Sequence, residues 1–214
     1  MNKFIPLFLF LGCAGISKAQ ISAITDNGKQ VILYKNGTWK YLADSTANGN
    51  STSDSLKLNP VKFSKSASET FLVKSTIFNI GVFMDPHKWT MAPHRENESI
   101  PEYKFSLKSG NGMAMLISEK VSISLENMTD VALVNAQKAA LDARVTNREY
   151  RIVNGNKILF LEMSGTIEGI KFKYMGYYFS SPKGTMQLLT YTTEELYKET
   201  NKELEAFLNG FVVI

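Results

Sequence analysis

Three tight turns in the C-terminal half constrain the fold of this sequence more than any other feature. They lie at Asn154-Gly155, Glu168-Gly169 and Pro182-Lys183-Gly184, and they separate long segments rich in β-branched and aromatic residues. Strands joined by such short connections lie antiparallel, because a parallel pair needs a crossover of about a dozen or more residues. The sequence therefore predicts an antiparallel sheet at the centre of the fold.

Further strands and two helices are predicted around this sheet. Thr76–Met84 has the pattern of a strand, and Gly110-Asn111-Gly112 is the turn of a hairpin. A first helix is expected over Asn127–Arg144, and the capping box Thr192–Glu195 predicts a second helix that ends at Gly210. The apolar stripe of this second helix comprises Leu196, Thr200, Leu204, Phe207, Leu208 and Phe211. The predicted fold class is α+β, an antiparallel β-sheet flanked by two main helices.

The segment 20–42 predicts a small three-stranded β-meander. Asn27-Gly28 and Asn36-Gly37 are typical of two-residue hairpin loops, which would set Ile24 opposite Val31 and Ile32 opposite Tyr41. That register gathers a candidate binding face of Ile32, Tyr34, Trp39 and Tyr41. A sheet of this size is marginally stable alone, so the face must dock somewhere. The main domain of the chain, a protein partner or second copy, and a carbohydrate or cell-wall ligand are the alternatives.

The first 19 residues have the pattern of a secretory signal peptide. Lys3 precedes the apolar run "FIPLFLFLG", and Ser17-Lys18-Ala19 is a small-x-small cleavage site before Gln20. The sequence therefore predicts an exported bacterial protein, periplasmic or extracellular, that does not span the membrane. "FLGC" also resembles a lipobox, so a lipoprotein anchored at Cys13 is the alternative. Cys13 is the single cysteine, and a chain cut after Ala19 has no disulfide or thiolate nucleophile.

Composition divides the rest of the chain and excludes one class of partner. Residues 43–60 are rich in Ser, Thr, Asn and Asp and predict a flexible linker, whereas 61–214 is continuously patterned and predicts the main domain. The net charge of +4 falls to +2 once Lys3 and Lys18 leave with the signal peptide. Without a concentrated basic stripe, a nucleic-acid partner is not expected.

A search for catalytic motifs finds one weak candidate. The sequence has no nucleophile elbow, no phosphate-binding loop and no His-Glu-x-x-His helix, and no cofactor is expected. His87 and His94 lie in "DPHKWTMAPHRENE" near Asp85, Glu96 and Glu98, which are all metal-ligand types. Their spacing matches no ligand signature, and an ordinary exposed loop explains the segment as well. Trp89, just past a strand end, is expected in the core.

The order of elements carries a family resemblance. A strand ending in "GVFMDPHKW", a hairpin, a helix, the meander "GNKILFLEMSGTIEGIKFKYMGYYF" and a C-terminal helix resemble the Mog1/PsbP-like α/β/α sandwich families, over Ser75–Val213. "VILYKNGTWKY" is similar to a short Asn-Gly-Thr-Trp module near the start of other exported bacterial proteins. The resemblance implies accessory and binding roles, with no shared functional motif to transfer.

The predicted function is therefore an exported, non-enzymatic binding or accessory protein of the bacterial cell envelope. Two alternatives stay open. One is a small metal-dependent hydrolase that uses the His87/His94 loop, and the other is a lipid or small-ligand carrier with a cavity between sheet and helices.

Overall fold

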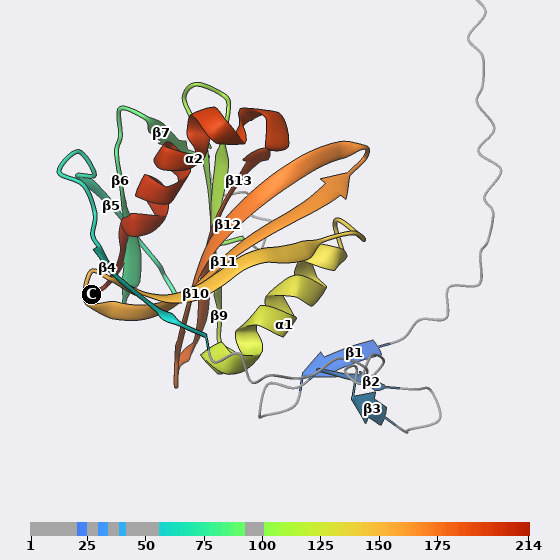
Figure 1. Cartoon of the computed structure of the whole chain (residues 1–214). Coiled ribbons are helices and arrows are strands. Elements are labelled where there is room, and N and C mark those ends of the chain that lie inside the picture. Colours follow the sequence, from blue (N-terminus) through green and yellow to red (C-terminus); the bar gives the residue numbers. More distant parts are fainter. Residues whose placement is uncertain (1–20, 25–29, 34–38, 42–55, 93–100) are drawn as a thin grey trace, which may run out of the picture.

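A large twisted sheet organises the molecule (Figure 1). The computed structural model describes residues 21–24, 30–33, 39–41, 56–92 and 101–214. The large sheet has eight strands in the order β4-β10-β11-β12-β13-β9-β8-β7. These strands are β4 (Leu58–Phe63), β7 (Trp89–Met91), β8 (Tyr103–Leu107), β9 (Met113–Glu119), β10 (Arg144–Val153), β11 (Asn156–Ile167), β12 (Ile170–Ser181) and β13 (Gly184–Thr193).

The predicted antiparallel meander is the centre of this sheet. β10, β11, β12 and β13 pair consecutively and antiparallel. Asn154 and Gly155 have φ values of 47° and 84°, and Glu168 and Gly169 have 50° and 82°. Positive φ at both central residues is the geometry of a type I′ turn, whose twist matches the strands that it joins. The turn chemistry thus produced the predicted pairing, and the α+β fold class is confirmed.

β4 adds a parallel strand that the sequence did not reveal. It pairs with β10 in parallel, while the other pairs of the described strands are antiparallel. β4 begins at Leu58, within the range expected for the linker. Its polar and proline-containing sequence, "LNPVKF", lacks the period of a buried strand, because it is an edge strand with one free side.

The two helices lie on opposite sides of the large sheet (Figure 1). α1 (Leu125–Gln137) is shorter than the predicted Asn127–Arg144 and begins after Ser124. Residues 138–143 leave the helix, and a Cβ added to Gly165 would lie 2.8 Å from the Cβ of Ala140. The alanines after α1 therefore pack on the sheet instead of continuing the helix, and β10 starts at Arg144.

Helix α2 (Glu194–Asn209) begins later than predicted but ends where the prediction placed its end. Thr192 belongs to β13, and its Oγ1 donates a hydrogen bond to the carbonyl oxygen of Asn111 at 2.6 Å. The N-cap residue is Thr193 without a side-chain cap bond, so the predicted capping box is wrong. The helix ends at Gly210 as expected, but Phe211 starts strand β14 and is not part of the helical stripe.

A second sheet of three strands covers the α2 side of the core. Its order is β14-β6-β5, from β5 (Phe71–Lys74), β6 (Ile80–Met84) and β14 (Phe211–Val213). The predicted strand Thr76–Met84 is therefore too long. The Ser75 hydroxyl accepts hydrogen bonds from the backbone N–H groups of Ile77 and Phe78 at 3.1 and 3.2 Å, which holds this stretch in a turn before β6.

The N-terminal meander exists, with a register one residue away from the prediction. β1 (Ile21–Ile24), β2 (Gln30–Leu33) and β3 (Trp39–Tyr41) form an antiparallel sheet in that order. Val31 lies opposite Ala23 and Tyr41, whereas Ile32 lies opposite Lys40. The predicted pairing of Ile32 with Tyr41 is therefore wrong. Five residues separate Ile24 from its partner Gln30, and this odd number is incompatible with the two-residue loop that the prediction assumed.

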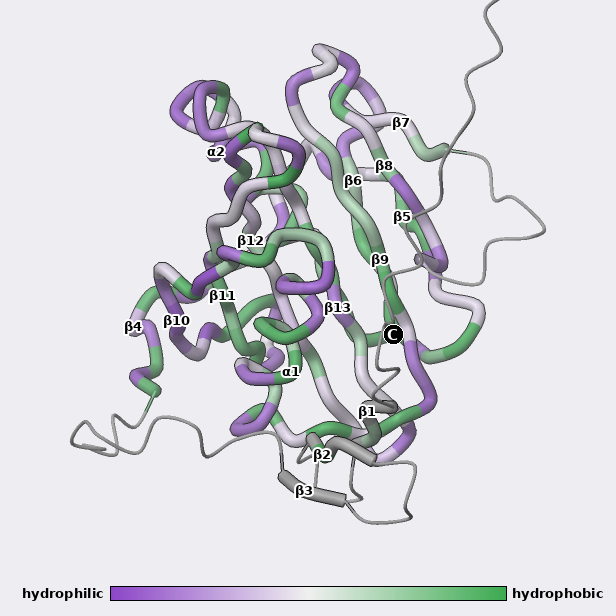
Figure 2. The backbone as a smooth tube through the Cα atoms, turned by 90° about the vertical axis from the view of Figure 1, so that its right-hand side faces the viewer, coloured by the Kyte–Doolittle hydropathy of each residue, from purple (hydrophilic) through white to green (hydrophobic). Residues whose placement is uncertain are grey.

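Two apolar clusters hold the large sheet between its helices. The cluster on the α2 side contains Phe105, Leu116, Tyr177, Leu188 and Phe207, all 1% exposed or less. The smaller cluster on the α1 side is built on Met128, Leu159, Leu161 and Tyr178. Figure 2 shows the view onto the α1 side, with α1 in front of the sheet and β13 and β9 beside it.

Candidate functional site

His87 forms part of the wall of an open hollow beside the middle of α2. The hollow has a volume of about 450 Å³ and is lined by His87, Lys88, Lys108, Glu199 and Glu203, among others. The His87 backbone N–H donates to Asp85 Oδ1 at 2.8 Å, which orders the turn after β6. His94 lies outside the described residues.

Three charged groups of this hollow are already engaged with the protein. Lys108 Nζ donates to the carbonyl oxygen of Pro86 at 2.8 Å, and Lys88 Nζ lies 3.5 Å from Glu203 Oε1. No group of three or more His, Cys, Asp or Glu side chains suited to a metal ion occurs within the part of the chain that the structure describes. Trp89, by contrast, is 3% exposed and packs 4.4 Å from the Phe207 ring, which confirms its place in the core.

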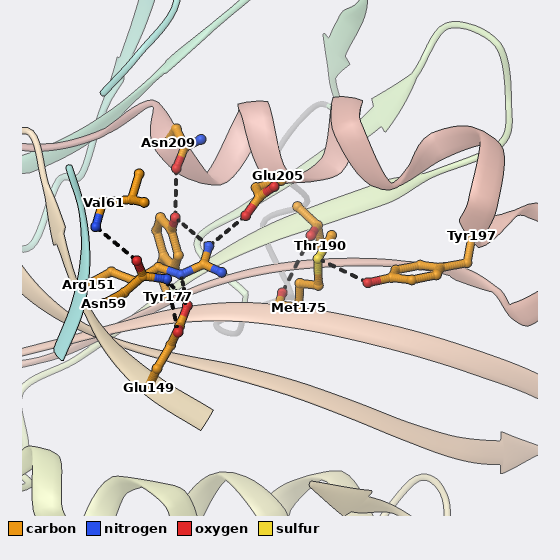
Figure 3. Close-up of polar contacts among 10 residues, drawn as sticks. All are labelled: Asn59, Val61, Glu149, Arg151, Met175, Tyr177, Thr190, Tyr197, Glu205 and Asn209. Carbon is orange, nitrogen blue, oxygen red and sulfur yellow. Dashed lines mark hydrogen bonds and ion pairs between the residues drawn. The ribbon is translucent and has the colours of Figure 1, made fainter. Parts of the chain in front are cut away.

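A buried arginine centres the most connected polar cluster (Figure 3). Arg151 on β10 is 6% exposed. Its Nε donates to Glu149 Oε1 at 2.6 Å, and its Nη1 donates to Glu205 Oε1 at 2.7 Å and to the Tyr177 hydroxyl at 3.2 Å. The Cζ atom of Arg151 also lies 3.6 Å from the centroid of the Phe160 ring. Charge pairing and ring contact together offset the desolvation of a charge inside the fold.

The partners of Arg151 extend this cluster over four elements. The Tyr177 hydroxyl donates to Asn209 Oδ1 at 2.6 Å, at the end of α2. Asn59 Nδ2, from β4, donates to both oxygens of Glu149 at 3.0 Å. Burial raises the pKa of Tyr177 to about 12, although the neighbouring Arg151 opposes the shift. The cluster therefore ties β4, β10, β12 and α2 together.

Sequence reasoning missed this cluster for a definable reason. In "REYRIV" Arg151 stands between Tyr150 and Ile152. The alternation of a strand therefore predicts that Arg151 lies on the polar, solvent-facing side. Glu149, 19% exposed, is two residues away on the same strand, but Glu205, 39% exposed at the side chain, comes from a distant part of the chain. A charged residue on the core face of a strand is recognisable only when its partners are known.

A partly exposed apolar surface lies on the α1 side of the large sheet. Along β9 the residues alternate between buried and exposed positions, but the outward positions are Met113, Met115 and Ile117 instead of polar residues. Met113 is 37% exposed. On the neighbouring β13, Leu189 and Tyr191 have the same orientation and are also partly exposed. An antiparallel sheet face in contact with water normally carries polar residues, so this face is unusual.

Register shows that these residues form a continuous surface. Met113 lies opposite Tyr191, and Tyr191 lies opposite Tyr174 of β12, with a distance of 5.7 Å between the two tyrosine rings. Met115 lies opposite Leu189, which in turn lies opposite Gly176. The open face is defined here as Met113, Met115, Ile117, Tyr174, Leu189 and Tyr191.

Gly176 shapes the middle of the open face. A Cβ at this position would come within 2.7 Å of both Leu189 Cδ2 and Tyr178 Cε2. Leu189 and Tyr178 therefore close over the glycine, and a side chain there would push Leu189 outward. At the rim, Lys104 of β8 lies opposite Met115 and places an exposed lysine beside the methionines.

Comparison with known proteins adds evidence about the fold. No protein-family model and no characterised protein sequence matches the chain. The solution structure of CyanoP, the PsbP of the cyanobacterium Synechocystis sp. PCC 6803, superimposes with a TM-score of 0.52 at 13% identity, over 70% of this chain and 95% of CyanoP. The chain has the PsbP-like fold. The resemblance expected from the order of elements is thereby confirmed.

Two further structures share less of the geometry of this PsbP-like chain. LpqN, involved in cell envelope biogenesis of Mycobacterium tuberculosis, gives a TM-score of 0.43 at 10% identity, over 66% of this chain and 88% of LpqN. A protein of unknown function from Pseudomonas aeruginosa gives 0.42 at 9% identity, over 66% and 95%. Neither described helix of the PsbP-like chain has the length and apolar character to cross a bilayer.

Proposed function

We propose that this protein is an exported, non-catalytic binding protein of the bacterial envelope, and that the open face is its partner-binding surface. One observation carries the proposal. Six apolar residues from three adjacent strands, all with the same orientation, remain partly exposed on a sheet whose other side is buried under α2 and the second sheet. Contiguous apolar surface of this kind marks interaction sites, because leaving it in water is unfavourable.

The chemistry of the open face favours a protein segment as the partner. Methionine side chains adapt to different shapes, and tyrosines supply rigid area with a polar tip, a combination typical of protein-binding surfaces. The Arg151 cluster and the hollow beside His87 offer no comparable apolar area, since both are lined mainly by charged and polar groups, several of them paired within the chain.

Site-specific photo-crosslinking tests the proposal. We expect a photo-reactive amino acid at Met113 or Tyr191 of the exported protein to crosslink a defined envelope protein in intact cells. The matched control places the same group at Lys198, an exposed position on α2. Crosslinks of equal yield from all three positions, or none from the open face, would contradict the proposal. Met113→Lys should weaken binding to the captured partner at least about tenfold, the effect of a charge in the centre of an interface.

The export part of the proposal rests on the N-terminal sequence and has its own test. Cleavage after Ala19 predicts a mature chain that starts at Gln20 with no lipid. Intact mass of the protein from the envelope fraction distinguishes this from a chain that begins with a lipidated Cys13. A cytoplasmic full-length chain would refute export in either form.

A further inference from the structure

We propose that the hollow beside α2 is a second binding site, which takes a small zwitterion such as a short peptide with a free ammonium and a free carboxylate group. This site is independent of the open face, because the hollow borders α2 whereas the open face lies on the α1 side of the large sheet. Its volume of about 450 Å³ falls within the range of small-molecule sites, about 300–1,000 Å³.

The charges of the hollow are separated by the element that carries them. Lys88 directly precedes β7 and Lys108 directly follows β8, so both lysines come from the sheet. Glu199 and Glu203 both lie on α2, where a spacing of four residues puts them on the same face of the helix. The ion pair between Lys88 and Glu203 joins the two sides. A ligand with opposite charges at its two ends is complementary to this arrangement.

Each side also carries one charge without an opposite charge among the described residues. Glu199 forms no ion pair in this part of the chain, and the nearby Glu203 repels it. Lys108 donates one hydrogen bond to the carbonyl oxygen of Pro86, which leaves two of its three N–H donors for a ligand. A ligand ammonium at Glu199 and a ligand carboxylate at Lys108 would neutralise both groups with charge-assisted hydrogen bonds.

The backbone around the hollow is held in place by contacts within the chain. The Lys108 backbone N–H donates to the carbonyl oxygen of Lys88 at 2.8 Å, which joins the two segments that carry the lysines. A Cβ on Gly112 would lie 2.7 Å from Leu107 Cδ1 and 2.8 Å from Leu204 Cδ2, so the hairpin between β8 and β9 packs closely against α2. A site assembled in advance loses less conformational entropy on binding.

Uncharged groups complete the lining between the two sides. Leu107 and Thr200 are buried residues that still border the hollow, so they form its floor. Ser109 and Asn111, in the turn between β8 and β9, add a hydroxyl and an amide. These side chains offer both donors and acceptors, which suits the N–H and C=O groups of a peptide bond.

Ligands with charge of a single sign fit the hollow less well. An inorganic anion attracted by the lysines would also meet the carboxylates of Glu199 and Glu203. A diamine attracted by those carboxylates would meet Lys88 and Lys108. Like charges brought together are unfavourable, so the lining selects for a ligand that carries both signs.

Titration of the isotope-labelled protein with dialanine, followed by NMR, tests the site and locates it. We expect saturable shifts of the backbone amides at 87–88, 108–111 and 199–203, which border the hollow. N-acetyl-dialanine has no ammonium and dialanine amide has no carboxylate. Each capped form should therefore bind at least about fivefold more weakly than dialanine, as expected for one charged contact in a partly open site.

Two substitutions assign each end of the ligand to its partner. Glu199→Gln should weaken dialanine at least about fivefold and leave N-acetyl-dialanine unchanged, because that probe has no ammonium. Lys108→Gln should weaken dialanine to a similar extent and leave dialanine amide unchanged. Glu195→Gln removes an exposed carboxylate on α2 outside the lining, so this matched control should bind dialanine like the parent chain.

Three results would overturn the zwitterion site. Equal binding of dialanine and both capped forms shows that the hollow recognises uncharged groups only. Shifts of the same amides with inorganic phosphate, but not with dialanine, show an anion site. Absence of saturable shifts with either probe shows that the hollow binds neither class. None of these results involves the open face, so the zwitterion site and the photo-crosslinking experiment fail separately.

Discussion

Arg151 shows how one buried charge organises distant parts of the chain. Removing it leaves Glu149 and Glu205 without their cation, and Tyr177 without a donor in the protein interior. We expect Arg151→Ala to lower the free energy of unfolding by about 3–5 kcal/mol, as is typical for breaking a buried ion pair. Urea unfolding monitored by circular dichroism measures this change.

A surface pair provides the matched control for Arg151. Lys171 and Glu194 lie 3.8 Å apart with side chains 72% and 48% exposed. Lys171→Ala should change the free energy of unfolding by less than about 1 kcal/mol, because exposed pairs are screened by solvent. Similar losses for the two substitutions would show that the Arg151 cluster does not position α2 and β4.

Glu69 gives the fold a dependence on pH. It is 2% exposed, and its Oε2 accepts a hydrogen bond from the Ser66 backbone N–H at 2.6 Å. Burial raises its pKa from 4.5 to about 7, opposed by that hydrogen bond and by Lys65. The folded state thus holds the proton more tightly than the unfolded state, and the associated stability is present below pH 4.5 and lost as the pH rises through about 7.

Glu69→Gln tests this dependence, since glutamine keeps an acceptor for Ser66 and cannot ionise. From pH 5 to pH 8 the parent chain should lose up to about 3 kcal/mol of unfolding free energy that Glu69→Gln keeps. Glu168→Gln, in the exposed turn between β11 and β12, is the control and should follow the parent chain. Parallel pH profiles for the parent chain and Glu69→Gln would refute the assignment.

At the scale of elements, Gly210 joins the end of α2 to the second sheet. Its carbonyl oxygen accepts a hydrogen bond from the Phe83 backbone N–H at 2.8 Å. A Cβ on Gly210 would overlap the carbonyl oxygen of Phe83, although the φ of −69° is open to any residue. The glycine is required by close approach of two backbones and not by backbone conformation.

Substituting this glycine should therefore separate β14 from β6. We expect Gly210→Ala to destabilise the fold by about 2–4 kcal/mol through overpacking against backbone, measured by thermal unfolding. Gly155→Ala is the control, because its Cβ would meet nothing within 4 Å and only the φ of 84° is strained. That change should cost about 1–2 kcal/mol. A smaller loss at Gly210 than at Gly155 would contradict the proposed packing.

At the scale of the whole molecule, the strand order predicts a gradient of stability. β11, β12 and β13 are flanked by strands on both sides and carry both apolar clusters, whereas β4 and β7 are edge strands. We expect amide hydrogens of β11–β13 to exchange slowest, with protection near the global stability, and those of β4 and β7 to exchange much faster. Hydrogen exchange with mass spectrometry measures the gradient. Equal protection of β4 and β12 would contradict the role of β4 as an edge.

The sequence by itself determined the elements that depend on neighbours along the chain. The turns at Asn154-Gly155 and Glu168-Gly169 impose type I′ geometry, so the meander follows from local chemistry, as do the existence of the N-terminal meander and the end of α2 at Gly210. The PsbP-like order of elements was readable for the same reason. Hydrophobic periodicity and turn residues are signals contained within a few residues. They can therefore be read without knowing which strand is the partner.

Only the tertiary structure decided what depends on contacts between distant segments. β4 pairs with β10 across about 90 residues, and Arg151 meets Glu205 from α2, so neither has a signal within its own segment. The register of β1–β3 depends on the length of two loops. A difference of one residue in the pairing moves the side chains of a strand to the opposite face of the sheet. The open face arises because α1 lies against β12 and the apolar outward row of β9 remains partly exposed. Long-range packing leaves no signal within a short stretch of sequence, and it is what sets the candidate site.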